Sequence, residues 1–86
     1  MSRPLDEIRA QITANDGVIV SAVNERLRLV SALWELKREI GVDQIDHGRE
    51  QALRQELASL NTGPLSARGL DRLVTELLAL TKGELA

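Results

Sequence analysis

Two cationic side chains, Arg26 and Lys37, lie on the face of the first predicted helix that should be dry. At about 100° per residue, most apolar side chains between Pro4 and Ile40 fall on one arc of a helical wheel. These apolar residues are Leu5, Ile8, Ile12, Ile19, Val23, Val30, Leu33 and Ile40. Asn15, Arg26 and Lys37 fall near the middle of the same arc, about three turns apart, with a drift of about 20° per step. Cations on an apolar arc need a partner.

Two interpretations of these cations remain open at this point. They form ion pairs with Asp or Glu across a dimer interface and set its register, as buried ion pairs sometimes do. Alternatively they face a cavity and bind an anion, since Arg suits bidentate recognition of a carboxylate and Lys supplies a compact charge. Arg9 lies on the flank of the arc, on a bearing similar to those of Leu27 and Trp34, from which it can reach a partner chain.

The helix that carries these side chains is predicted to be very long. Pro4 suits a first helical turn, with Ser2 or Arg3 as the cap, and Gly41 is a natural stop. A helix of about 36 residues is about 54 Å long, whereas a compact 86-residue globule has a radius of gyration near 12 Å. Its own chain therefore cannot cover this helix, and we predict an intertwined homodimer with two-fold symmetry.

The rest of the chain predicts two more helices and no strand. Asp46 is the expected N-cap of a short helix over residues 47–60, and residues 61–64 (Asn-Thr-Gly-Pro) form a turn. Ser66 then caps a medium helix over residues 67–82, with Leu65 and Leu70 placed for a hydrophobic staple. The expected fold is all-α, with a long, a short and a medium helix in one domain spanning residues 1–86.

Composition excludes several classes of function. A net charge of −2 argues against nucleic-acid binding, and the single Trp, without Phe or Tyr, gives no base-stacking platform. With no Cys and one His, we expect no disulfide, no metal site and no cysteine nucleophile. No apolar run approaches 18 residues and the N-terminus lacks a signal-peptide core, so no membrane partner is expected and the expected location is the cytoplasm.

An ordered set of residues then points to a family. The succession Leu5-x-x-Ile8-Arg9-x-x-Ile12-x-x-x-Asp16 resembles the start of the all-α chorismate mutases. Arg26, Lys37 and the segment Asp46-x-x-Arg49-Glu50 continue the pattern at the family's spacing, over nearly the whole chain. The resemblance implies an intertwined homodimer with two equivalent sites that rearrange chorismate, a dicarboxylate, to prephenate by a [3,3] shift without a cofactor.

The resemblance also implies a role for each site residue. Arg26, with Arg9 from the other protomer, would hold the two substrate carboxylates. Lys37 would donate to the ether oxygen, where negative charge grows as the C–O bond breaks. Glu50 would accept a hydrogen bond from the ring hydroxyl. Asp46 and Arg49 would complete that side of the pocket.

The C-terminal end matches the family less well. Thr81 fits a position where family members place a small hydroxyl residue in the substrate site. Four residues later Leu85 stands where the family commonly has a Gln or Glu that reaches the ether oxygen, with Glu84 one place early. The short tail is similar to compact actinobacterial-type members, which the first enzyme of the shikimate pathway activates. This similarity predicts a synthase partner that reorders residues 82–86.

Other functions remain open from sequence alone. Isochorismate-pyruvate lyase and aminodeoxychorismate mutase share this scaffold, and a non-catalytic helical dimer that binds a partner would use the charges as interface pairs. Trp34 is expected in interface packing, Asp16 in polar contacts along the dimer, and Asn15 has no assigned role. The remaining residues are expected on exposed, solvated helix faces: His47, Arg54, Glu56, Arg68, Asp71 and Arg72.

Overall fold

The chain folds into three helices in the order long, short, medium. The computed structural model describes residues 2–41 and 47–86. Helix α1 spans Arg3–Ile40, α2 spans His47–Leu60 and α3 spans Ala67–Leu85. Within these two ranges there is no strand, and the predicted all-α class is confirmed.

The ends of α1 lie where the sequence predicts them. Ser2 is the N-cap, and its hydroxyl oxygen accepts a hydrogen bond from the Leu5 amide at 3.4 Å. Pro4 stands in the first turn, where its missing N–H group removes no helical hydrogen bond. Gly41 ends the helix in the left-handed region with φ of 76°, and its amide bonds back to the Arg38 carbonyl at 3.3 Å.

A tight turn reverses the chain between α2 and α3. The Asn61 side chain accepts from the Gly63 amide at 3.0 Å and donates to the Leu65 carbonyl at 2.9 Å. Ser66 caps α3 as predicted, since its hydroxyl oxygen accepts from the Gly69 amide at 3.0 Å. The predicted cap of α2, Asp46, lies outside the described residues.

The third helix is longer than the sequence indicates. It continues to Leu85, three residues past the expected end at Lys82. The Ala86 amide donates to the Lys82 carbonyl at 3.0 Å, so the helical pattern passes straight through Gly83. A glycine in a helix costs about 1 kcal/mol relative to Ala, which is too little to end a helix by itself.

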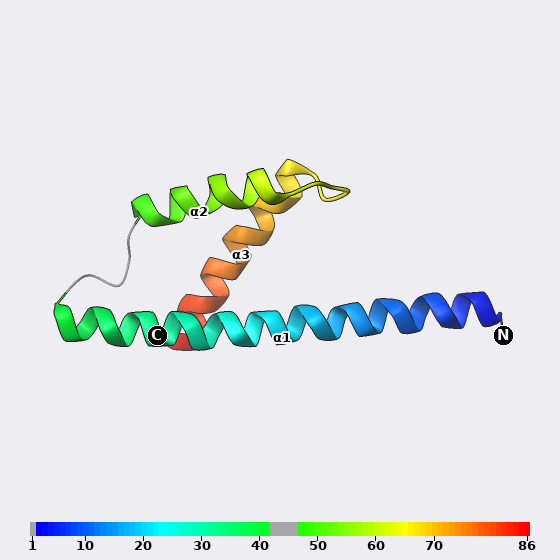
Figure 1. Cartoon of the computed structure of the whole chain (residues 1–86), viewed down its shortest axis with the longest axis horizontal. Helices are drawn as coiled ribbons and strands as arrows, with labels where there is room; N and C mark the ends of the chain where they lie inside the picture. The colour runs from blue at the N-terminus through cyan, green and yellow to red at the C-terminus, as the bar shows by residue number, and fades with distance from the viewer. Residues whose placement is uncertain (1, 42–46) are drawn as a thin grey trace.

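The three helices form an open, elongated arrangement (Figure 1). The end of α3 crosses the second half of α1, and α2 packs against α3. In the described residues α2 makes no packing contact with α1, although it runs back in the opposite direction above it (Figure 1). The chain extends 58 Å and has a radius of gyration of 16.7 Å, against about 12 Å for a compact globule of this length.

Very little of the described chain is buried. Val74 and Thr81, both on α3, are the only buried residues among those described, and none lies on α1. The accessible surface is 6945 Å², about 1,900 Å² more than the roughly 5,000 Å² typical of a folded monomer of this mass. The expectation that α1 cannot be covered by its own chain is therefore confirmed. None of the described helices is long and apolar enough to cross a membrane.

Candidate active site

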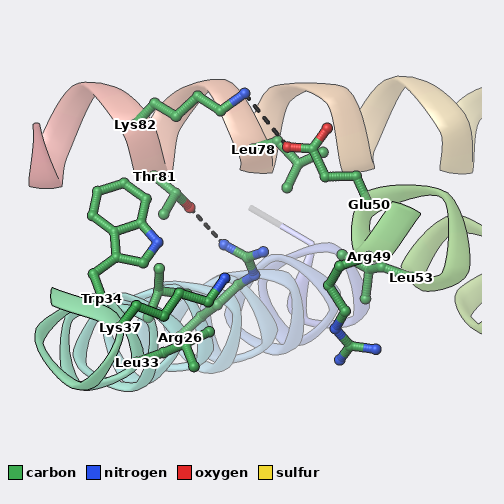
Figure 2. Close-up of a pocket in the computed structure, with 11 residues that line it drawn as sticks. Arg26, Leu33, Trp34, Lys37, Arg49, Glu50, Leu53, Leu78, Thr81 and Lys82 are labelled. Carbon is green, nitrogen blue, oxygen red and sulfur yellow. Dashed lines mark hydrogen bonds and ion pairs between the residues drawn. The ribbon is translucent and has the colours of Figure 1, made fainter. Parts of the chain in front are cut away.

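A cavity of about 280 Å³ is lined by residues of all three helices (Figure 2). The second half of α1 forms one wall, the first turns of α2 form another, and the last turns of α3 close it. Its lining residues are Arg26, Val30, Leu33, Trp34, Lys37, Arg49, Glu50, Leu53, Leu78, Thr81 and Lys82. The two cations that interrupt the apolar arc of α1 therefore face a cavity in this chain.

A buried hydroxyl fixes the first of these cations. Arg26 Nη1 donates to Thr81 Oγ1 at 2.5 Å across the junction of α1 and α3. The Thr81 hydroxyl in turn donates to the Leu77 carbonyl at 2.7 Å, so its proton has a partner and its oxygen is free to accept. Thr81 is only 5% exposed, so the Arg26 guanidinium is hydrogen-bonded to a buried side chain at the cavity wall.

A second polar contact spans the cavity between α2 and α3. Lys82 Nζ lies 3.5 Å from Glu50 Oε1, and both side chains keep partial access to solvent (Figure 2). Sequence reasoning missed Lys82 as a site residue. Helical spacing offers the signal that could have found it, because Lys82 stands one turn after the lining residue Leu78 and next to Thr81.

The lining charges are strongly unbalanced. Arg26, Lys37, Arg49 and Lys82 are cationic, whereas Glu50 is the one acidic side chain among the described residues that line the cavity. The whole chain carries a net charge of −2. Four cations around one cavity create a local positive electrostatic potential, although the net charge of the protein is negative. Such a cavity suits a small anion with more than one carboxylate. The lone carboxylate adds an acceptor for a hydroxyl group.

Several predicted site residues lie away from this cavity. Arg9 is exposed on the first half of α1, about 26 Å along the helix axis from Arg26. Asp46 is outside the described residues. Glu84 is exposed and Leu85 lies against Leu27 and other α1 residues in a separate groove, so neither reaches the cavity. The position at which a Gln or Glu was expected therefore presents no side-chain donor to the site.

The comparison with protein families agrees with this geometry. The family model described as chorismate mutase type II matches residues 8–84, almost the whole chain. The chain belongs to the chorismate mutase type II family. No curated protein matches it significantly. Membership identifies an isomerase of the all-α class that rearranges chorismate to prephenate, and the alternative of a non-catalytic dimer loses its support.

One side chain of this chorismate mutase lies elsewhere than the sequence predicts, and a second has a contact that the sequence does not predict. Trp34 lines the cavity beside Thr81 (Figure 2), and its packing in a dimer interface stays a prediction. Arg54, expected on an exposed face, is only 28% exposed because it is bound to Asp71 and Thr75 on α3. These partners are 17 and 21 residues away along the chain, and no helical period connects positions on two different helices.

Proposed function

We propose that the cavity between α1, α2 and α3 is the site at which this chain converts chorismate to prephenate. The observation that carries the proposal is the set of four cations and one carboxylate around a cavity of about 280 Å³ in a member of this family. An intramolecular rearrangement needs no proton transfer, so it gains from holding the substrate in its folded, reactive conformer. It gains further from fixed positive charge near the developing oxyanion.

In this proposal, the α1 cations contact the two reacting halves of the substrate. Arg26, held by Thr81, forms a bidentate pair with one carboxylate. Lys37 stands three turns further along the same side of α1 and donates to the ether oxygen as the C–O bond breaks. A compact ammonium group suits a single oxygen on which charge accumulates.

The start of α2 would receive the ring of the substrate. Glu50 accepts a hydrogen bond from the ring hydroxyl, and Arg49 and Asp46 complete that side of the site. The position of Glu50 on the cavity wall supports its role. Thr81 completes the pocket through its contact with Arg26.

We further propose that the active form is an intertwined homodimer of one 86-residue domain. The excess of about 1,900 Å² of accessible surface per chain, or about 3,800 Å² for two copies, falls in the range of total area that obligate homodimer interfaces bury. Arg9, exposed and distant from the cavity of its own chain, would then reach the cavity of the partner and hold the second carboxylate. The absence of Arg9 from the cavity of its own chain is what this arrangement requires.

Offering three substrates to the purified protein tests the reaction. Chorismate, isochorismate and aminodeoxychorismate are each incubated with the chain, substrate loss is followed by ultraviolet absorbance, and the product is identified by NMR. Prephenate from chorismate is the expected result. Pyruvate release from isochorismate alone, or turnover of aminodeoxychorismate alone, would assign the chain to a different reaction.

A synthase of the shikimate pathway is proposed as an activating partner. The missing donor at Leu85 leaves the ether oxygen with one contact fewer, and each such contact is worth about 10²–10³ in rate. A partner that reorders residues 82–86 would compensate for it. Titrating the synthase into the mutase assay is expected to raise kcat/KM at least 10-fold, and an unchanged rate would count against the partner.

A further inference from the structure

Arg54 links α2 to α3 through three hydrogen bonds. Its Nη1 donates to Asp71 Oδ1 at 2.7 Å and to the Asp71 carbonyl at 3.2 Å, and its Nη2 donates to Thr75 Oγ1 at 3.0 Å. The two arms of the guanidinium therefore grip two consecutive turns of α3. A planar fork with two fixed arms restricts rotation as well as distance, which a lysine ammonium would not do.

The position of α2 relative to the other helices depends strongly on the hydrogen bonds of Arg54. Among the described residues α2 packs on α3 and not on α1. Beside Arg54 the packing is incomplete, because a gap of about 120 Å³ remains between the two helices. The Arg54 guanidinium lies at the edge of this gap and bridges the two helices there.

A second charge pair connects the same two helices with the opposite polarity. On α2, Glu50 stands one turn before Arg54, on the same side of the helix. On α3, Lys82 lies C-terminal to the partners of Arg54. Its Nζ is 3.5 Å from Glu50 Oε1. In one pair α2 carries the cation, and in the other it carries the anion. The two pairs therefore favour a single direction and register of α2 along α3, because reversing α2 would bring like charges together.

We propose that Arg54 is a positioning residue that acts through Glu50. By fixing α2 against Asp71 and Thr75, Arg54 holds the Glu50 carboxylate at the wall of the cavity where the substrate's ring hydroxyl binds. This inference rests on the proposed role of Glu50 and adds a residue outside the cavity to the machinery of the site. A displacement of about 1 Å at a reacting contact costs about 100-fold in rate.

Kinetics on a double-mutant cycle test the link between the two residues. Arg54→Met removes both arms, Arg54→Lys restores one charge opposite Asp71, and Arg72→Met replaces a nearby exposed cation as the control. We expect Arg54→Met to lower kcat/KM about 10- to 100-fold, Arg54→Lys to recover part of that loss, and Arg72→Met to change nothing. In a Glu50→Ala background, Arg54→Met should cost less than about 3-fold, since the group it positions is gone.

The proposal is overturned if Arg54→Met keeps wild-type kinetics, or if it costs the same factor in both backgrounds. Should Arg54→Met fail to fold, Asp71→Asn replaces it in the cycle, because the Asp71 side chain is 70% exposed and the substitution leaves its size unchanged. Additive losses with that variant would overturn the proposal equally.

Amide hydrogen exchange provides a readout that needs no turnover. In the substrate-free protein, Arg54→Met should speed exchange across residues 48–60, whereas Arg72→Met should not. Unchanged exchange in α2 overturns the anchoring role of Arg54. If the wild-type chain leaves chorismate unconverted, the proposed function fails instead, and the two failures are thereby distinguished.

Discussion

The apolar arc of α1 runs through both halves of the helix, but the two halves differ in which residues it contains and in what covers it. In residues 3–22 the middle of the arc carries no charged side chain, Asn15 is its one polar residue, and Ile8, Ile12 and Ile19 are each more than half exposed. In residues 23–40 the arc contains Arg26 and Lys37, and α3 crosses it to close a cavity. Where the chain covers its own helix, the arc becomes polar and builds a site. Where it does not, the arc stays uncharged and exposed, and this is the half that we propose a second copy covers.

The largest expected loss of activity comes from a substitution in the second half of α1. Replacing Lys37 with Ala should lower kcat/KM for chorismate by about 10²–10³, because it removes the charge that we propose lies nearest the ether oxygen. Helical content and melting temperature, measured by circular dichroism, should remain close to wild type. Arg38→Ala, an exposed cation at the adjacent position, is the control and should keep full activity. Unfolding of the Lys37 variant would instead indicate a structural ion pair.

The next prediction tests whether the first half of α1 contributes a residue to the active site of another chain. Arg9→Ala should lower kcat/KM by about 100-fold although Arg9 lies about 26 Å from Arg26 within one chain. Arg3→Ala, another exposed cation of the first turns, should leave the activity unchanged. Equal activity of the Arg9 variant and the wild type would remove Arg9 from the site.

Mixing two inactive variants sharpens this test. If Arg9 reaches the partner's cavity, a heterodimer of the Arg9→Ala and Lys37→Ala chains contains one intact site. Refolding the two chains together should then restore about a quarter of wild-type activity, since random pairing makes half of the dimers mixed. Activity that stays at the level of the separate variants would show that each site is built from one chain.

A large effect on assembly is expected at Ile12, together with a loss of activity that depends on protein concentration because only the dimer has complete sites. Ile12→Asp places two charges in a symmetric interface, because each copy carries the change, and should raise the dimer dissociation constant at least about 100-fold. Sedimentation velocity at several concentrations measures it. Ala10→Glu, on the opposite side of α1, is the matched control. A wild-type chain that sediments as a monomer at all concentrations would contradict the comparison between the two halves.

The smallest effect is expected at a surface ion pair of the second half. Arg28 Nη1 lies 3.1 Å from Glu25 Oε2, and both side chains are more than 60% exposed. Arg28→Ala should change the free energy of unfolding by no more than about 0.5 kcal/mol, measured by urea denaturation, and leave kcat/KM unchanged. A larger loss would assign Arg28 to a contact with another chain.

Local rules account for most of what the sequence predicts correctly. Ser2, Gly41 and Ser66 mark helix ends through hydrogen bonds that span only a few residues, so their positions are readable from the sequence. Arg26 and Lys37 stand out in the sequence as charges on an apolar arc, and the family resemblance adds Glu50 to them. The structure brings all three to one cavity.

The sequence does not reveal contacts that depend on the way in which two helices pack against each other. The Arg54 fork and the Glu50–Lys82 pair join residues of different helices, and their partners follow from the angle and register of packing. The end of α3 was misplaced because the residues around Gly83 continue the helical hydrogen bonds despite the glycine. Asn15 is exposed on α1, and nothing in the structure explains its place on the apolar arc.

The position of Trp34 gives the protein a spectroscopic property. It is the sole aromatic residue apart from His47, with no Tyr or Phe in the chain, and it lies on the cavity wall. Near-ultraviolet excitation therefore reports on one ring in each copy, without background from other fluorophores. Quenching of its emission by an anion that enters the cavity would measure occupancy directly, in the unlabelled wild-type protein and with inhibitors that undergo no reaction.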